Sequence, residues 1–398
     1  MKWEKVKLGN VTDSCLGKML DQNKNKGDYQ PYLANVNVRW GEFDLEDLPL
    51  MKFEESEQER YELKYGDLVI CEGGEPGRCA IWKEQIPNMK IQKALHRVRV
   101  HDCLDYRYLF YWFLLAGKTG ELDQYFTGAT IKHMPGQKLK EVVIDKPPLE
   151  IQHRIADILS AYDDLIENNQ KQIKLLKEAA QRLYKEWFVD LRFPGHENTK
   201  IVDGVPEGWS KSTVSEVSAV LRRGISPKYN EKARGIVINQ KCIRQTIVSY
   251  DEARTQEKKY PAELEMMESD IVICSTGAGT LGRVGQIFEA KENATLDSHV
   301  TLIRADEKIG QQSLFWSLKM KQDYLMNAGK GSTNQLELSR ETIGNCKILI
   351  PERKIAEQAE KNFVAIHNKM KECSMQIARL REARDLLLPK LMSGEVEV

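Results

Sequence analysis

The sequence repeats itself after about half of its length. Residues 128–148 return as residues 331–351, and each copy begins with Gly, a small residue and Thr and ends with a strand-like run before a proline. The interval is 203 positions, and the same interval carries Asp67, at the head of an apolar run, onto Asp270. The repeat predicts one domain that is built twice, and therefore two similar sites in a fixed relation.

Each copy has the pattern of a mixed domain of about 150 residues. Short β-rich runs are separated by Gly, Asn and Asp turns, and one helical stretch lies near 106–116 in the first copy and near 313–326 in the second. We therefore predict one domain over residues 1–148 and the other over residues 198–350.

A different pattern follows each domain. From Ile155 to Trp187 the apolar positions advance in steps of four and three residues, and Asn169 is the polar exception. A seam sustained over more than four heptads predicts a long coiled-coil helix. A similar seam runs from Ala359 to Leu391, interrupted by Arg384, with an offset of 204 positions from the first. We assign residues 149–197 to the first helix with its linker and 351–398 to the second helix.

Neither predicted helix can bury its apolar stripe alone. Two copies of one unit close most simply about a two-fold axis, which sets the helices antiparallel. We predict an α+β protein in which two tandem globular α/β domains are joined by two long helices that form an antiparallel coiled coil, with a pseudo-two-fold internal repeat. Asn169 fits a residue that fixes the register of the seam, and the alternative is an asparagine that faces solvent.

Charge and cysteine content limit the function. The 59 basic and 59 acidic side chains cancel, so any polyanion site must be a local patch. The eight cysteines include no C-x-x-C pair, which favours reduced thiols. No apolar run reaches the ~18 residues of a membrane span, and the first residues do not resemble a signal peptide. We expect a cytoplasmic protein.

One motif suggests a cofactor site. Residues 277–282 spell G-x-G-x-x-G after a strand-like run, where a dinucleotide or S-adenosylmethionine loop would lie. The next residues, 283–288, have the pattern of a strand, so no helix N-terminus would point at a phosphate. The two copies share no candidate catalytic pair, and the histidines lack metal-ligand spacing. We expect no catalytic residue, no metal and no cofactor in this chain.

The copies do share glycine-rich loops that carry a base. Small residues let backbone N–H groups approach a phosphate, and Arg and Asn can bind base edges. The alternative for any one loop is a plain tight turn with a solvated cation, but recurrence at matched positions favours binding. The candidate DNA-binding residues are Lys18, Gly77, Arg78, Thr127, Gly128, Thr130 and Lys132 in the first copy, and Arg222, Arg223, Thr280, Arg283, Lys330, Ser332, Thr333 and Asn334 in the second.

Three segments, 147–156, 180–193 and 386–395, make the chain similar to the specificity (S) subunit of type I restriction-modification systems. The resemblance covers essentially the whole chain, although residues 351–358 keep only the proline of the first copy's Pro-Leu-Glu-x-Gln pattern. It implies two target-recognition domains, each recognising one half of a bipartite DNA sequence. The helices would set the gap, since about 35 helical residues span roughly 50 Å, or some 15 base pairs.

The resemblance also implies partners and a non-catalytic role. Two modification subunits would bind S-adenosylmethionine and methylate adenine, and two restriction subunits would use ATP and Mg²⁺ to translocate and cut DNA. The helices and their apolar ends would dock the modification subunits, although each of these end residues could equally be buried in the chain's own core. The docking candidates are Phe188, Leu191, Phe193, Leu388 and Met392.

Two other functions stay open from the sequence. One is a coiled-coil scaffold whose domains bind proteins and not DNA. The other is a methyltransferase that uses the loop at 277–282, which would require the chain itself to bind S-adenosylmethionine. Because the two copies have diverged strongly between their shared segments, a DNA target would be asymmetric.

Overall fold

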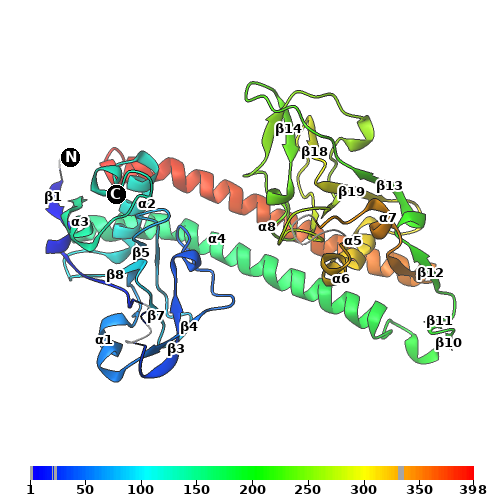
Figure 1. Cartoon of the computed structure of the whole chain (residues 1–398), viewed down its shortest axis with the longest axis horizontal. Coiled ribbons are helices and arrows are strands. Elements are labelled where there is room, and N and C mark those ends of the chain that lie inside the picture. Colours follow the sequence, from blue (N-terminus) through cyan, green and yellow to red (C-terminus); the bar gives the residue numbers. More distant parts are fainter. Residues whose placement is uncertain (1–2, 20, 22–24, 330–335) are drawn as a thin grey trace. The chain divides into compact units, whose positions relative to one another are not determined.

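The computed structural model describes residues 3–19, 21, 25–329 and 336–398. The chain divides into two compact units, of which the first comprises residues 1–167 and 377–398 and the second residues 168–376. Each unit contains one globular domain and a part of both long helices (Figure 1). The division differs from the predicted one because each long helix belongs partly to both units.

The first domain contains a four-stranded antiparallel sheet and a three-stranded mixed sheet. The larger sheet has the order β2 (Thr12–Leu16), β8 (Leu95–Val100), β5 (Leu68–Cys71), β6 (Cys79–Ile81). The smaller has the order β4 (Leu50–Phe53), β3 (Asp28–Leu33), β7 (Lys90–Ile91), and a separate pair joins β1 (Glu4–Lys7) to β9 (Val143–Lys146). All four residues of β5 are buried, which explains its uninterrupted apolar sequence.

The helix predicted near 106–116 is α2 (Tyr106–Thr119). It begins where the Asp105 carboxylate accepts hydrogen bonds from the backbone N–H groups of Arg107 and Tyr108, and it ends at Gly120 in the left-handed conformation. Eight of its residues are buried, so it forms the centre of the first core. Two shorter helices, α1 (Gln58–Tyr61) and α3 (Gly136–Glu141), complete the domain.

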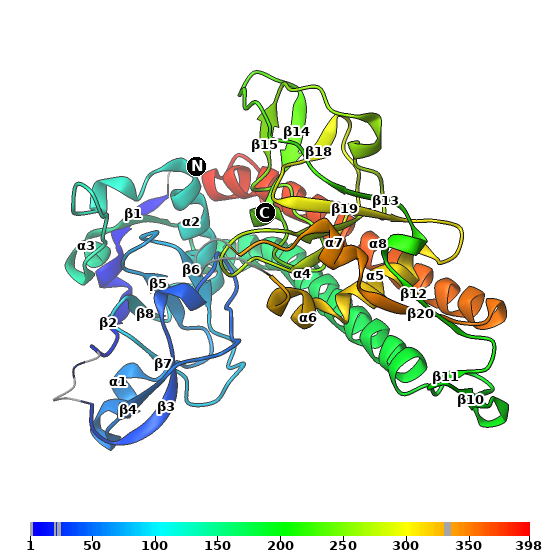
Figure 2. The same ribbon diagram turned by 45° about the vertical axis from the view of Figure 1, so that its right-hand side comes forward.

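The second domain repeats this architecture. Its larger sheet has the order β13 (Ser218–Arg223), β19 (Val300–Ala305), β16 (Ile271–Cys274), β17 (Val284–Gln286), which matches the first domain strand for strand. Its smaller sheet has the order β15 (Arg254–Gln256), β14 (Gly235–Ile238), β18 (Ala294–Leu296), and these three strands lie together in Figure 2. The remaining pairs join β12 (Ser210–Thr213) to β20 (Lys347–Ile350) and β10 (Ile201–Val202) to β11 (Val205–Pro206).

The single helical stretch predicted near 313–326 is two helices. These are α5 (Gln311–Lys319) and α6 (Gln322–Asn327), with Met320 and Lys321 between them. The short α7 (Arg340–Gly344) takes the place of α3. As predicted, the residues after the glycine-rich motif form a strand, β17, and no helix.

The long helices are α4 (Leu149–Tyr184), which continues as a π-helical turn over Lys185–Val189, and α8 (Arg353–Ser393). They run antiparallel in both units. In the first, Asp163 of α4 pairs with Arg384 of α8 at 2.5 Å. In the second, the Cys373 thiol donates to Gln172 Oε1 at 3.8 Å. The antiparallel pairing is thus confirmed within each unit.

Two residues of the apolar seam, Asn169 and Arg384, are polar or charged, and the structure places them in different surroundings. Asn169 is only 6% exposed, so the solvent-facing alternative is wrong. Arg384, which interrupts the apolar seam, ion-pairs with Asp163 and Asp385, and Asp163 also accepts a hydrogen bond from the Tyr111 hydroxyl of α2 at 2.6 Å. The arginine therefore connects the helix pair to the first domain.

Cysteine chemistry agrees with the sequence. All eight cysteines are free thiols. Within the described ranges, no group of acidic, histidine and cysteine side chains could hold a metal ion. No helix among the described residues is long and apolar enough to cross a membrane.

Candidate nucleic-acid interface

A buried acid positions the candidate loops in both domains. Asp67 stands before β5 and pairs with Arg99 of β8, and Asp270 stands before β16 and pairs with Arg304 of β19. Each strand then leads into the glycine-rich loop that was singled out from the sequence. Asp67 and Asp270, which lie 203 positions apart in the sequence, therefore occupy equivalent positions in the two domains.

In the first domain the two candidate loops lie side by side. The residues between β5 and β6 include Gly73, and the second loop runs from Thr127 to His133. His133 forms β-bridges with both Gly73 and Thr127, and Met134 N–H donates to Glu72 O at 2.7 Å. A Cβ on Gly73 would lie 2.8 Å from His133 Nδ1, so this contact requires glycine. The structure thus brings together two segments more than 50 residues apart.

Arg78 lies in this cluster but is held by its own domain. Its Nη1 donates to Glu75 at 3.0 Å, and its Nη2 donates to the Asn35 backbone and side-chain oxygens at 3.1 and 3.2 Å. Its Nε is buried, and no acceptor for it is found among the residues that the structure describes. Gly77, which precedes it, has a φ of 88° and leaves no room for a Cβ against Leu122. The guanidinium can bind DNA only if it shares or leaves these partners.

The second loop of the first domain is open to solvent. Thr127, Gly128, Thr130 and Lys132 are all exposed. Gly128 has a φ of 92°, and a Cβ there would lie 2.3 Å from Ile131 O, so the loop turns at this residue. Lys132 lies 3.4 Å from Asp123, and its ammonium is 5.6 Å from the centre of the Phe126 ring. These exposed groups have the chemistry of a phosphate or base contact.

The second domain brings together the equivalent segments. Thr276 forms a β-bridge with Glu337, and Leu338 N–H donates to Ser275 O at 2.9 Å, which matches the contact of Met134 with Glu72. The predicted residues Lys330, Ser332, Thr333 and Asn334 lie outside the described residues. Gly329, just before them, approaches Leu281 of the first loop, since a Cβ there would be 2.4 Å from Leu281 Cδ2.

Arg283 differs from its equivalent Arg78. It is partly exposed, and within the described ranges no hydrogen-bond or ion-pair partner is found for its side chain. Lys319 donates to Val284 O and to Gln322 Oε1, both at 2.8 Å. Burial first, then the positive charges of Lys177 and Arg283, lower the pKa of Lys319 to about 8. The surroundings of Arg283 are therefore electropositive.

Three further candidates are engaged within the domains. Thr280 donates to Thr276 O at 3.0 Å and so closes its own loop. Arg222 pairs with Glu263, and Arg223 pairs with Glu337 and approaches Ser275 O at 3.4 Å. Arg223 thus lies at the junction of the two loops.

Lys18 is placed differently from the other candidates. Its side chain is only 4% exposed, and its Nζ binds Lys52 O at 2.9 Å and Glu57 at 2.5 Å. Its counterpart by strand register is Ile225, because the bridge of Lys18 to Gln92 corresponds to that of Ile225 to Asp297. In this structure the ammonium is internal to the fold and not accessible to DNA.

Sequence reasoning missed three residues at the loop junctions. These are His133 in the first domain and Glu337 and His299 in the second, where Thr276 Oγ1 and His299 Nδ1 are 2.6 Å apart. His133 and Glu337 occupy equivalent places, since each directly precedes the residue that bonds back to the strand end. Comparison of the residues that flank the matched anchors could have identified this pair. The substitution of acid for histidine makes the two candidate surfaces chemically different.

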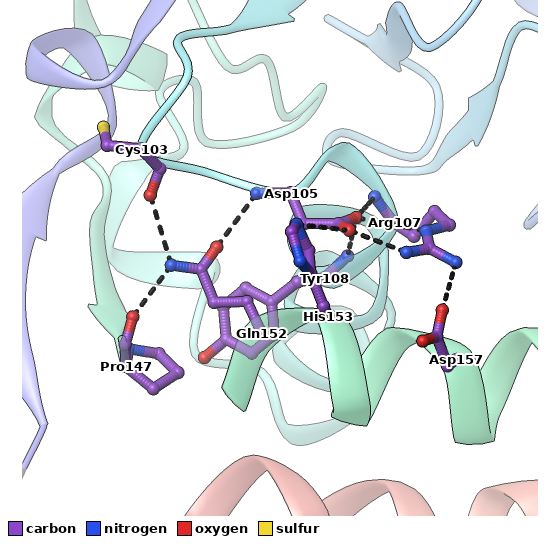
Figure 3. A network of polar contacts seen from close by, with 8 residues as sticks. All are labelled: Cys103, Asp105, Arg107, Tyr108, Pro147, Gln152, His153 and Asp157. Carbon is purple, nitrogen blue, oxygen red and sulfur yellow. Dashed lines mark hydrogen bonds and ion pairs between the residues drawn. The ribbon is translucent and has the colours of Figure 1, made fainter. Parts of the chain in front are cut away.

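The first domain is joined to α4 by a buried glutamine (Figure 3). Gln152 donates to Cys103 O at 3.2 Å and to Pro147 O at 2.8 Å, and it accepts from Asp105 N–H at 2.9 Å. Its side chain is fully buried. Arg107 extends the contact, because it pairs with Asp105 and with Asp157 of α4. The start of α2 and the helix α4 therefore belong to one hydrogen-bonded network.

The second domain is joined to α8 by different chemistry. Glu360 accepts hydrogen bonds from Gln312 N–H at 3.0 Å, Ser313 N–H at 2.8 Å and the Ser313 hydroxyl at 2.7 Å. A carboxylate at the first turn of α5 satisfies backbone donors that have no partner within the helix. Ala356 takes the place of Gln152, in agreement with the loss of the glutamine motif in the second copy.

The apolar residues expected to dock partners are used inside the chain. Leu388 and Met392 belong to the core of the first unit, and Phe188 and Phe193 to that of the second, where Leu191 packs against them. The stacking of Phe188 on Tyr184, with ring centres 4.9 Å apart, shows the close fit. In this structure these side chains pack in the cores of the chain's own units, which is the alternative to docking a partner.

Comparison with known proteins adds independent information. A family model described as "Type I restriction modification DNA specificity domain" matches residues 1–178 and 206–367. The chain is 28% identical to the type I restriction enzyme MjaIX specificity subunit of Methanocaldococcus jannaschii, over 84% of this chain and 78% of that protein. It is 24% identical to the HindI specificity subunit of Haemophilus influenzae, over 99% of both chains. The crystal structure of an S subunit from M. genitalium has a similar fold, with a TM-score of 0.59 and 18% identity over 98% of this chain and 96% of that one.

Proposed function

Because this chain belongs to the type I restriction modification DNA specificity family, we propose that each of its domains recognises one half of a split DNA target. The chain is the DNA-specificity component of a restriction-modification system. What we propose is how the chain divides DNA recognition between its two domains. Two domains with one fold would contact DNA through the same face, and the antiparallel helices would set the gap between the half-sites.

The observation that carries this proposal is the matched pair of loop clusters. In each domain the loop after the buried central strand is bridged to a second segment, through Gly73 and His133 in one and Thr276 and Glu337 in the other. These two bridges are equivalent, and the side chains of His133 and Glu337 differ. Equivalent surfaces with different chemistry favour two different half-sites, and so an asymmetric target.

Recognition without catalysis fits the chemistry of these clusters. Their side chains offer hydrogen-bond donors and cations, which position DNA and bind base edges. We propose that modification subunits bind S-adenosylmethionine and methylate the DNA, and that restriction subunits supply the ATP- and Mg²⁺-dependent steps. The exposed surfaces of α4 and α8, in place of the apolar residues packed inside the chain, would then dock the modification subunits.

The test substitutes one cluster at a time in the full chain assembled with its modification subunits. Arg283→Ala should weaken binding by about tenfold to a hundredfold and relax sequence preference in one half-site only. Arg78→Ala should affect the other half-site. Lys132→Gln serves as a second variant there, because it leaves the contacts of Arg78 with Asn35 intact. Lys211→Ala, at an exposed side chain of β12 that lies outside the candidate loops and the long helices, is the matched control.

A protein-binding scaffold predicts a different result. Sequence-dependent binding to a duplex library would then be absent from the parent complex. If the parent selects a split target but all three loop variants keep its full preference, recognition lies elsewhere on the domains. Equilibrium dialysis of the isolated chain with S-adenosylmethionine should detect no binding, whereas saturable binding would support the methyltransferase alternative.

A further inference from the structure

An open groove of about 530 Å³ lies in the first domain. It is formed by the edge strand β2, the helix α3 and a segment of α1. The polar side chains that line it are Ser14, Cys15, Arg60, His96, Gln137 and Lys140. None of these residues was singled out from the sequence.

The groove is positively charged. Arg60 and Lys140 are exposed, and no carboxylate is among the lining residues. Arg60 lies over the Tyr61 ring, 5.4 Å from its centre. Within the part of the chain that the structure describes, neither cation has an ion-pair partner. The Ser14 hydroxyl and the Gln137 amide add neutral donors, so the groove presents donors and cations to a ligand.

A buried arginine beside the groove has one nitrogen without an acceptor among the described residues. Arg97 lies opposite Cys15 in the β2–β8 ladder, and both residues contact the end of α1: Arg97 Nη1 donates to Glu59 O at 3.2 Å and the Cys15 thiol to Arg60 O at 3.1 Å. Arg97 Nε is buried, and no hydrogen-bond partner is found for it within the described ranges. Such an unsatisfied donor costs about 1–3 kcal/mol. The positive charge of Arg97 adds to that of Arg60 and Lys140, which line the groove, and so favours an anionic ligand there.

The second domain closes the equivalent place. Leu221 corresponds to Ser14, because Leu221 pairs with Ile303 where Ser14 pairs with Val98. Gly344 corresponds to Lys140, and a Cβ on Gly344 would lie only 3.2 Å from Leu221 Cδ2. In the second domain a leucine thus replaces the serine and a glycine replaces the lysine, and the leucine packs against the helix. The groove is a property of the first domain and is not required by the fold.

The first domain makes room for the lysine at a different position. A Cβ on Gly9 would lie 2.9 Å from Lys140 Cβ, and in the second domain the residue at that place is Ser215, packed against Gly344. In the first domain the glycine of this contact is Gly9, which faces Lys140. In the second domain it is Gly344, which faces Ser215. The exchange keeps α3 close to the helical turn at Leu8–Asn10 while it places a cation at the groove.

From these observations we propose that the groove between β2 and α3 binds a phosphate group of the DNA backbone. Arg60 and Lys140 supply the charge, and Ser14 and Gln137 supply neutral hydrogen bonds. The inference rests on the proposed function, since it assigns the anion to DNA. It predicts that the first domain makes a sequence-independent contact for which the second domain has no counterpart here.

The first test removes the charge in the full chain with its modification subunits. The double variant Arg60→Gln/Lys140→Gln should bind cognate duplex about tenfold more weakly, and the slope of log affinity against log salt should fall by about 1. Sequence preference should not change. The control Lys211→Gln/Lys347→Gln removes two charges from the β12–β20 sheet of the other unit and should alter neither quantity.

A second variant fills the groove without changing charge. Ser14→Leu introduces the leucine of the second domain, and it should reproduce the loss of affinity while thermal melting shows a folded chain. If both groove variants keep the affinity and salt slope of the parent, the inference is wrong although DNA recognition stands. If the parent itself selects no DNA sequence, the proposed function fails first.

Inorganic phosphate distinguishes the source of the anion. Phosphate that stabilises the parent against heating, and not the double variant, together with unchanged DNA binding in that variant, would assign the groove to a free anion and overturn the DNA contact. Loss of DNA binding in the variant supports the inference whether or not free phosphate also binds.

Discussion

Asp67 accepts hydrogen bonds from Nε and Nη2 of Arg99, both at 2.7 Å. The same carboxylate accepts from Lys64 N–H at 2.7 Å, and so it closes the turn that leads into β5 while it ties β5 to β8. Asp270 repeats each contact, with Arg304 at 2.6 and 2.8 Å and with Met267 N–H at 2.7 Å. Two sequences that have otherwise diverged keep this arrangement at the base of the candidate loops.

Loss of this pair should destabilise one unit at a time. Asp67→Asn leaves the guanidinium of Arg99 without its charge partner, and a broken pair of this kind costs about 3 kcal/mol. Calorimetry of the full chain should show a lower melting transition for the first unit, and Asp270→Asn should lower that of the second. Asp13→Asn is the control, because its exposed pair with His101 should contribute less than about 1 kcal/mol. Equal melting in the parent and both core variants would contradict a structural role.

Gln152 should be required for the attachment of the first domain to α4. Gln152→Leu has a similar size but leaves Cys103 O, Pro147 O and Asp105 N–H without their partner, at a cost of about 2–4 kcal/mol. Urea denaturation should show the loss, and hydrogen exchange should increase at the start of α2. Gln358→Leu, on an exposed face of α8, should be nearly neutral. A stable Gln152→Leu variant with unchanged exchange would show that the apolar core alone holds this joint.

Gly310 and Glu360 should be energetically coupled. A Cβ on Gly310 would lie 2.1 Å from the Glu360 carboxylate, so Gly310→Ala must displace the cap of α5. We expect a loss of about 1–3 kcal/mol in the glycine variant. In the double variant with Glu360→Ala the glycine substitution should cost much less, because the clash is gone. A double-mutant cycle of unfolding free energies measures this, and strictly additive values would exclude the coupling.

Lys319 should reduce stability at neutral pH. Its folded pKa of about 8 is below the ordinary value of 10.5, so the unfolded chain binds more protons between these values and stability rises with pH across this window. Below pH 8 the lysine is charged in the folded chain as well, so the full cost of burying its charge lowers the free energy of unfolding. Lys319→Leu replaces the buried ammonium by an apolar side chain, and should stabilise the chain by about 1–2 kcal/mol at pH 7 and less at pH 10. Lys354→Leu, on the exposed side of α8, should leave the pH profile of unfolding unchanged.

The sequence predicted some parts of the candidate site better than others. Glycine-rich loops after an apolar run have a local signal, and the structure does place the loop of Arg78 beside that of Thr127. The local sequence does not show whether a cation in such a loop is free to bind DNA. Arg78 is held by Asn35, which is 43 positions away, whereas no such partner is found for Arg283 among the described residues. The ammonium of Lys18 is buried where it pairs with Glu57, a residue 39 positions away in the sequence.

The break between α5 and α6 was also beyond the sequence pattern. Residues 313–326 keep a helical distribution of apolar positions, yet the chain leaves the helix at Met320. Lys319 Nζ reaches across to Val284 O, and Gln322 accepts from Val284 N–H at 3.0 Å. These tertiary bonds to β17 take the place of continued helix, which a periodic pattern cannot show.

By itself the sequence determined the duplication, the two heptad helices and the buried strands headed by Asp67 and Asp270, because periodicity and repeated spacing are properties of the chain alone. Only the tertiary structure decided which polar side chains are used up by the fold. Gln152 and Glu360 join the domains to the helices through partners roughly 50 residues away, and Leu221 fills in one domain the groove that Ser14 leaves open in the other. Such contacts depend on distances between segments that are remote in sequence, and this is why two copies of one fold offer different surfaces to a ligand.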